Sequence, residues 1–318
     1  MSALIRVVRA RGSGGPARGV ALCLCSALSF SLLPFLANAA YAAGMGLAEL
    51  LLMRFVVAAV ALWAIVAVRR PSLLQPRLAV VGLALGGVGY ATQSALYFAA
   101  LPYNGPSLNT LLLYTFPVIV FIVLLARGKE RATPARLLAL VLALAGVAVV
   151  LSGTGSGELH PIGITLGLGT AFAYATYILV GEAVDESFDR ILLSAFVCTG
   201  AAATYLLINA VSGGPEIDFK PAGWLWAGAL GLVATAFALT AFFAGMRLVG
   251  AASASIISCV EPVATVLIGV SLFSDRLSPL QLLGALAVVA AVVLLQRRQT
   301  TDPSPAPAPR PEDASRGG

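Results

Sequence analysis

Two ionisable side chains stand inside long apolar stretches of the sequence. Glu261 lies about halfway along the apolar run 251–273. Arg54 lies several residues inside the run 47–68. A charge at the centre of a bilayer costs about 2.5–3.5 kcal/mol on insertion scales. If these runs cross a membrane, both side chains are candidate functional residues.

Glu261 is followed directly by Pro262. Proline has no N–H, so the carbonyl of Ser258 loses its helical partner. A carboxyl group beside such loosened backbone could bind a substrate amine or carry a proton. The structural alternative is a glutamate satisfied by a neighbouring hydroxyl or by Arg54. Pro117 is expected to break its own helix in the same way.

Arg54 also has two interpretations. Its guanidinium has the fork geometry that binds a substrate carboxylate. It could instead pair with Glu49 or Glu261 and stabilise the fold. Glu49 is five residues away, which is a poor spacing for a pair on one helix face. The sequence leaves substrate contact and structural pairing open.

Other candidate site residues are polar or aromatic side chains in further apolar runs, where each could also hydrogen-bond a neighbouring helix. They are Asn38, Gln93, Tyr97, Asn109, Tyr114, Tyr174 and Tyr177. Gln93 and Tyr97 are four residues apart, and Tyr174 and Tyr177 are three apart, so each pair shares a helix face. We expect these two pairs to line a cavity.

The elements that must position these residues are membrane spans. Charged residues make up 11% of the chain and hydrophobic residues 59%, with a mean hydropathy of +0.94. A soluble domain carries about 25% charged residues, and a span needs about 20 apolar residues. Ten apolar runs are found, and Leu101–Pro106 predicts a tight turn between the third and the fourth. The runs are 20–40, 47–68, 78–101, 107–126, 135–151, 162–180, 191–211, 222–246, 251–273 and 280–295.

The basic residues indicate the orientation of the chain. With ten spans and a cytoplasmic N-terminus, all of the 20 Lys and Arg residues except Lys220, Arg276 and Arg54 fall on the inside. Both termini are therefore expected in the cytoplasm. The tight loops and the lack of a eukaryotic-style targeting segment favour a bacterial inner membrane. The net charge of +6 sits in short clusters between apolar runs, so nucleic-acid binding is not expected. The first run resembles a signal peptide, but it is longer than the usual 7–15 residues of such an apolar region.

The sequence contains an internal repeat at an offset of 145 residues, as from Pro117 to Pro262. At this offset Gly105 matches Gly250, and the string 130–134 (Glu-Arg-Ala-Thr-Pro) matches 275–279 (Asp-Arg-Leu-Ser-Pro). Each half holds five spans, an odd number, so the two halves are expected to have opposite orientations. Inverted repeats that rock about a midplane site are a transporter architecture.

The repeat divides the chain into five segments. They are a basic cytoplasmic N-terminus (1–18), a first five-helix repeat (19–151), an external linker (152–161), a second five-helix repeat (162–297) and a disordered, proline-rich cytoplasmic tail (298–318).

These features together resemble an EamA-type member of the drug/metabolite transporter superfamily. The resemblance covers about residues 19–297 and rests on residues 49–55 (Glu-Leu-Leu-Leu-Met-Arg-Phe), Pro117, Glu261-Pro262 and the strings that contain Glu130 and Asp275. It implies an all-α integral membrane protein with ten transmembrane helices, arranged as two inverted five-helix repeats around a central cavity. It also implies export or exchange of small metabolites, often amino-acid-like.

The functional expectation is a proton-coupled secondary transporter that exports amino acids or related zwitterions by alternating access. The alternatives are a multidrug or lipid-type exporter of the same fold and, more remotely, a non-transporting membrane scaffold. No catalytic or ATP-binding motif occurs in a plausible context, so neither an enzyme, a cofactor nor a metal site is expected. The partners are a small-molecule substrate, the lipid bilayer and protons.

Gly82-x-x-x-Gly86 and Gly163-x-x-x-Gly167 permit close helix packing, within the chain or in a homodimer.

Overall fold

The computed structural model describes residues 15–69, 76–152, 160–184, 189–214, 218–273 and 278–301. Over these ranges the regular elements are helices, and nine of them are long and apolar enough to cross a membrane. A tenth, Pro279–Leu295, is apolar but shorter. Helices satisfy their own backbone N–H and C=O groups, as a hydrocarbon solvent requires. The predicted all-α membrane fold with ten spans is confirmed.

The N-terminal half contains five spans, three of which are built from more than one helical piece. The pieces are α2 (Gly15–Phe30), α3 (Leu33–Ala42), α4 (Leu47–Arg69), α5 (Pro76–Ala84), the π-helical segment η1 (Leu85–Tyr90), α6 (Ala91–Leu113), α7 (Phe116–Ala126) and α8 (Pro134–Leu151).

The chain reverses within α6. Asn109 and Tyr97 are twelve residues apart, which in a straight α-helix is about 18 Å. Yet Asn109 Nδ2 donates a hydrogen bond to the Tyr97 carbonyl oxygen at 2.8 Å. The third span ends at Asn104 and the fourth begins at Leu108. The predicted turn is therefore made within backbone that stays helical, with a side-chain amide bridging the two arms.

The C-terminal half repeats this order. Its elements are α9 (Pro161–Glu182), α10 (Arg190–Val211), α11 (Ala222–Gly231), the π-helical segment η2 (Leu232–Phe237), α12 (Ala238–Val249), α13 (Ala251–Ser258), α14 (Val260–Phe273) and α15 (Pro279–Thr301). The last helix continues through residues 298–301, whereas the sequence predicts that the tail begins at residue 298. A helix does not have to end where its apolar region ends.

Several predicted features lie outside the described residues. They are most of the basic N-terminus, the glycine-rich part of the linker at 153–159, residues 275–277 of the second repeated string, and the tail beyond Thr301.

The spans of the two halves are broken at equivalent places. α6 ends at Leu113 and α7 begins at Phe116, with Pro117 in the first turn of the new helix. In the second half α13 gives way to α14 at Cys259, just before Pro262. A further break between α2 and α3 has no counterpart, because α9 is continuous.

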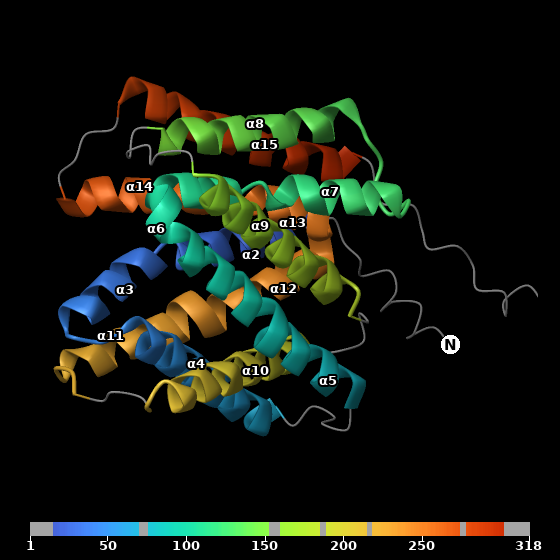
Figure 1. Ribbon diagram of the computed structural model, residues 1–318. Coiled ribbons are helices and arrows are strands. Elements are labelled where there is room, and N and C mark those ends of the chain that lie inside the picture. Colours follow the sequence, from blue (N-terminus) through green and yellow to red (C-terminus); the bar gives the residue numbers. More distant parts are fainter. Residues whose placement is uncertain are drawn as a thin grey trace, which may run out of the picture.

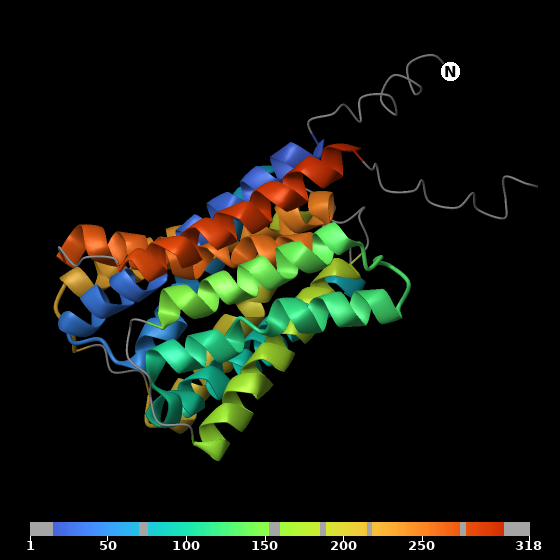
Figure 2. The same cartoon turned by 90° about the horizontal axis from the view of Figure 1, so that it is seen from above.

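The packing of the helices follows the repeat. α4 packs against its equivalent α10, and α8 against its equivalent α15. The first span of each half packs on the other half, α2 against α12 and α9 against α6. In Figure 1, α8 and α15 lie side by side along the top, and α4 and α10 along the bottom. Figure 2 shows that α2 begins and α15 ends at the same end of the bundle.

The small-residue motifs serve packing within the chain. A Cβ atom on Gly86 would collide with the backbone of Val197 and crowd Ala201, both on α10. One on Gly163 would collide with Asn104. These glycines let helices of the same chain approach closely, so they supply no separate argument for a homodimer.

Candidate functional site

Glu261 lies at the helix break of the ninth span. It is the second residue of α14 and is only partly exposed. The hydroxyl of Tyr114 lies close enough to its carboxylate to interact with it. Tyr114 is 4% exposed and occupies the equivalent break in the first half, between α6 and α7. The two breaks therefore bring a carboxylate and a phenol together between the halves.

Two more tyrosines surround Glu261. Tyr97 and Tyr174 both lie within electrostatic range of its carboxylate. The Tyr97 hydroxyl also shares a hydrogen bond with Thr110 Oγ1, at 3.2 Å. We call Glu261, Tyr97, Tyr114 and Tyr174 the carboxylate centre. It has one carboxyl group among phenol rings. The carboxylate can accept a proton or bind an amine, and aromatic rings also attract cations.

Arg54 forms a second polar centre. It is 3% exposed on α4. Its Nε donates to Thr235 Oγ1 at 2.6 Å, and its Nη2 donates to the Tyr90 hydroxyl at 3.0 Å. The guanidinium carbon lies 5.0 Å from the ring centroid of Phe55 and 5.6 Å from that of Tyr90, so it also makes cation–π contacts. We call Arg54, Tyr90 and Thr235 the arginine centre.

The hydrogen-bond partners of Arg54 are neutral. Within the described ranges no acidic side chain, including Glu49 and Glu261, lies within ion-pair distance of Arg54. The pairing with an acid that the sequence left open is therefore absent there. Glu261 is close enough to interact with Arg54 electrostatically, so the carboxyl group and the guanidinium influence each other without forming an ion pair.

The partners of Arg54 come from equivalent places in the two halves. Tyr90 ends η1, and Thr235 lies in η2. They are 145 residues apart, which is the offset of the repeat. π-Helical turns are rare and frequent at functional sites. The arginine centre therefore joins the only two π-helical segments among the described residues.

Aromatic rings connect the two centres. The rings of Tyr90 and Tyr177 meet edge to face at 6.3 Å between centroids, and those of Tyr177 and Tyr174 stack at 6.0 Å. The Tyr177 hydroxyl is buried and has no hydrogen-bond partner among the described residues. A buried, unsatisfied hydroxyl costs free energy, so this group has a donor and an acceptor available for a ligand.

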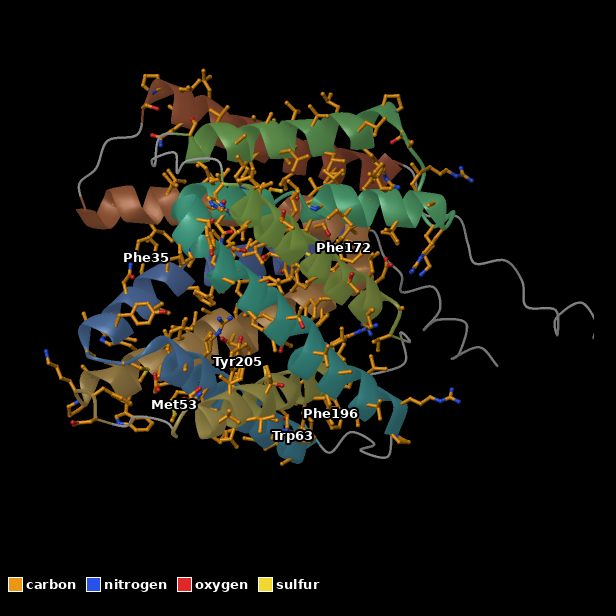
Figure 3. The ribbon with its side chains drawn as sticks, in the orientation of Figure 1. Phe35, Met53, Trp63, Phe172, Phe196 and Tyr205 are labelled. Atoms are coloured by element: carbon orange, nitrogen blue, oxygen red, sulfur yellow. The ribbon has the colours of Figure 1, made fainter. Side chains whose placement is uncertain are left out.

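The position equivalent to Arg54 in the second half has a different role. It is Thr199, whose hydroxyl accepts a hydrogen bond from Trp63 Nε1 at 2.9 Å. The ring of Trp63 packs edge to face on Phe196 at 5.2 Å, and Figure 3 shows the two side by side. The second half therefore has no buried cation at this position, and the two halves differ chemically at their centre.

The remaining predicted residues do not all join the centres. Asn109 is fully buried and bonded to backbone, as expected of a residue that holds helices together. Gln93 is partly exposed, and its Oε1 accepts a long 3.4 Å hydrogen bond from Ser94. Asn38 is exposed on α3. Tyr174 and Tyr177 do share a face, since their rings stack.

The sequence reasoning missed three residues of this region: Tyr90, Thr235 and Tyr205. Tyr90 precedes Gln93 by three residues and Tyr97 by seven, so it extends the helix face that was identified. Thr235 could have been found as its repeat partner. Tyr205 gave no such signal; its ring stacks on Phe55 at 5.8 Å.

Comparison with known proteins gives a family match to both halves. The model of the EamA-like transporter family matches residues 17–152 and again 161–297. A protein of Archaeoglobus fulgidus described as an uncharacterized transporter is 30% identical over 203 residues, covering 64% of this chain and 72% of that protein. The uncharacterized transporter YwfM of Bacillus subtilis is 27% identical over 223 residues, covering 68% and 74%. A crystal structure at 20% identity superposes with a TM-score of 0.77 and covers 89% of this chain and 98% of its own.

Proposed function

The chain belongs to the EamA-like transporter family, and we propose that it is a proton-coupled secondary transporter that exports amino acids or related zwitterions. The transport cycle would be alternating access, with the two halves rocking about the region between α6, α14 and α4. The chain would lie in the inner membrane with both termini in the cytoplasm. The predicted central cavity belongs to this proposal.

The observation that carries the proposal is a pair of opposite charges that lie near each other without pairing. Glu261 lies beside the Tyr114 hydroxyl, and Arg54 is hydrogen-bonded to Tyr90 and Thr235. A charge inside a membrane is costly, and neutral hydroxyls compensate it only partly. A zwitterion would give each group an opposite charge, its ammonium to Glu261 and its carboxylate to Arg54.

Proton coupling is assigned to Glu261. Its carboxylate can accept a proton, and the Tyr114 hydroxyl can donate to it when the proton leaves. If a proton and a substrate ammonium compete for this one carboxylate, inward proton movement drives outward substrate movement. The sequence has no ATP-binding motif, so a gradient is the available source of energy.

The experiment is transport in proteoliposomes with an imposed pH gradient. Wild-type protein is expected to move radiolabelled amino acids uphill and to catalyse counterflow without a gradient. Glu261→Gln, which keeps shape but not charge, should lose the uphill movement. A folded Glu261→Gln variant that transports with full proton dependence would contradict the assignment.

A multidrug exporter is the second candidate, and one observation favours it. The four phenol rings of Tyr97, Tyr114, Tyr174 and Tyr177 would suit a hydrophobic cation. Such a substrate would need Glu261 and not Arg54. Inhibition of transport by hydrophobic amines in both wild type and Arg54→Lys, with no response to amino acids, would support this alternative.

A further inference from the structure

Arg54 ties together elements that must separate when the halves rock. Its own helix, α4, and η1 belong to the first half, whereas η2 belongs to the second. The two hydroxyls that accept its hydrogen bonds are repeat partners, Tyr90 and Thr235. One buried side chain therefore bonds equivalent points of both halves.

The surrounding backbone makes this contact tight. A Cβ atom on Gly231, just before η2, would crowd Val57 and the carbonyl oxygen of Arg54 on α4. On the other side, η1 packs against α10, where a Cβ atom on Gly86 would collide with Val197. Each π-helical segment thus lies against the second span of the opposite half, and Arg54 reaches across from one segment to the other.

The two hydroxyl oxygens occupy one edge of the guanidinium. Nε and Nη2 are the donors of its lateral edge, and a carboxylate placed there would receive the same two hydrogen bonds. Thr235 Oγ1 and the Tyr90 hydroxyl hold those positions at 2.6 and 3.0 Å. Both hydroxyls already accept from a charged donor, but a carboxylate brings a full opposite charge and both acceptor oxygens in one rigid group, the bidentate pairing that Arg favours, so a carboxylate would displace the hydroxyls.

We propose that the arginine centre is a ligand-operated latch: a substrate carboxylate binds the lateral edge of Arg54, replaces Tyr90 and Thr235, and so releases η1 from η2. This inference rests on the proposed transport function and adds the event that couples substrate recognition to movement. Thr235 keeps its bond to the Leu230 carbonyl oxygen, at 2.9 Å, so the released hydroxyl is not left unsatisfied. The unpartnered hydroxyl of Tyr177, next to Tyr90, is available to the incoming carboxylate.

The latch predicts an unusual effect of removing the two hydroxyls that accept hydrogen bonds from Arg54. Removing a hydroxyl that contributes to a binding site weakens binding, whereas removing one that competes with the ligand strengthens it. Tyr90→Phe and Thr235→Val should therefore each raise the affinity for a carboxylate, by about tenfold or more for one hydrogen bond from a charged donor. Arg54→Lys keeps the charge but loses the fork, and should lower that affinity by about tenfold or more.

The test uses full-length protein in nanodiscs with propionate as the probe, because it carries a carboxylate and no amine. Binding is measured by thermal-shift titration, with propylamine as the matched ligand and Thr199→Val as the matched variant. Thr199 bonds Trp63 at the equivalent position, so its substitution should leave propionate binding unchanged. Hydrogen exchange over residues 85–97 and 230–242 should rise with propionate in the wild type and not in Arg54→Lys.

Three results would overturn the latch. They are unchanged propionate binding in Arg54→Lys, weaker binding in both Tyr90→Phe and Thr235→Val, or slower hydrogen exchange in η1 and η2 on binding. The probe does not use Glu261, and the measurement is at equilibrium. A failure of proton coupling in Glu261→Gln experiments is therefore distinguishable from a failure of the latch.

Discussion

The arginine centre and the carboxylate centre are built in different ways. The carboxylate centre forms where two helices break at repeat-equivalent places, and its partner Tyr114 lies at one break while Glu261 follows the other. The arginine centre forms at unbroken π-helical segments, and its partners are repeat mates. The first centre thus has loosened backbone around a carboxylate, whereas the second has a fixed cation between two tightly packed segments.

This difference suggests a division of roles. A partly exposed carboxylate beside helix ends can exchange a proton with little movement. A guanidinium that is 3% exposed and bonded to both halves binds a ligand only when the ligand displaces its two hydroxyls. An acidic and a basic side chain in one bundle therefore need not form a structural ion pair, because neutral hydroxyls can contact each of them instead.

The largest expected effect comes from the packing beneath the arginine centre. Gly86→Val would force a side chain into the backbone of α10, and overpacking against backbone lies at or above the upper end of the usual range, about 3 kcal/mol or more. We expect a lower melting temperature in detergent and loss of carboxylate binding. Gly228→Ala is the matched control, because a Cβ atom there meets nothing within 4 Å. Normal stability of Gly86→Val would show that η1 does not depend on this contact.

The next largest effect tests which tyrosine of the carboxylate centre matters most to Glu261. Tyr114→Phe removes the hydroxyl that interacts with Glu261, and a hydrogen bond to a charged group is worth at most about 1.5–3 kcal/mol. Amine affinity and the pH dependence of transport should both change, while propionate binding should not. Tyr97→Phe, whose hydroxyl shares its hydrogen bond with Thr110, should change them less. Equal effects of the two substitutions would remove the special role of Tyr114.

The smallest effects on ligand binding distinguish residues that only stabilise helix packing from residues that contact a ligand. Asn109→Ala removes a fully buried amide and should lower stability by about 1–3 kcal/mol with ligand preference unchanged. Asn38→Ala alters an exposed side chain and should be within about 0.5 kcal/mol of wild type. A change of ligand preference in either variant would place that residue in the site. Thermal unfolding and competition binding measure the two quantities.

The spans were predictable because the hydrocarbon sets their length and excludes charge. The run 135–151 became α8, Pro134–Leu151, with one residue of difference. The family match confirms the resemblance identified from the repeat, from residues 49–55 and from Glu261-Pro262. These signals are local, or repeat along the chain, so one sequence contains them.

The partners of the two charges were not predictable. Arg54 meets a residue 36 positions away and another 181 positions away, and which residues meet depends on packing of the whole bundle. π-Helical segments likewise come from tertiary contacts and have no sequence signature of their own. The break between α2 and α3 at Pro34 was missed because the apolar run continues through it.

The most direct test of the account is equilibrium binding of three matched ligands to wild type, Glu261→Gln and Arg54→Lys. Alanine carries both charges, alaninamide keeps the amine alone, and N-acetylalanine keeps the carboxylate alone. We expect a crossed pattern, in which Glu261→Gln weakens the binding of alaninamide and not of N-acetylalanine, and Arg54→Lys does the reverse. Equal weakening of all three ligands by both folded variants would contradict the assignment of the two charges to the two ends of a zwitterion.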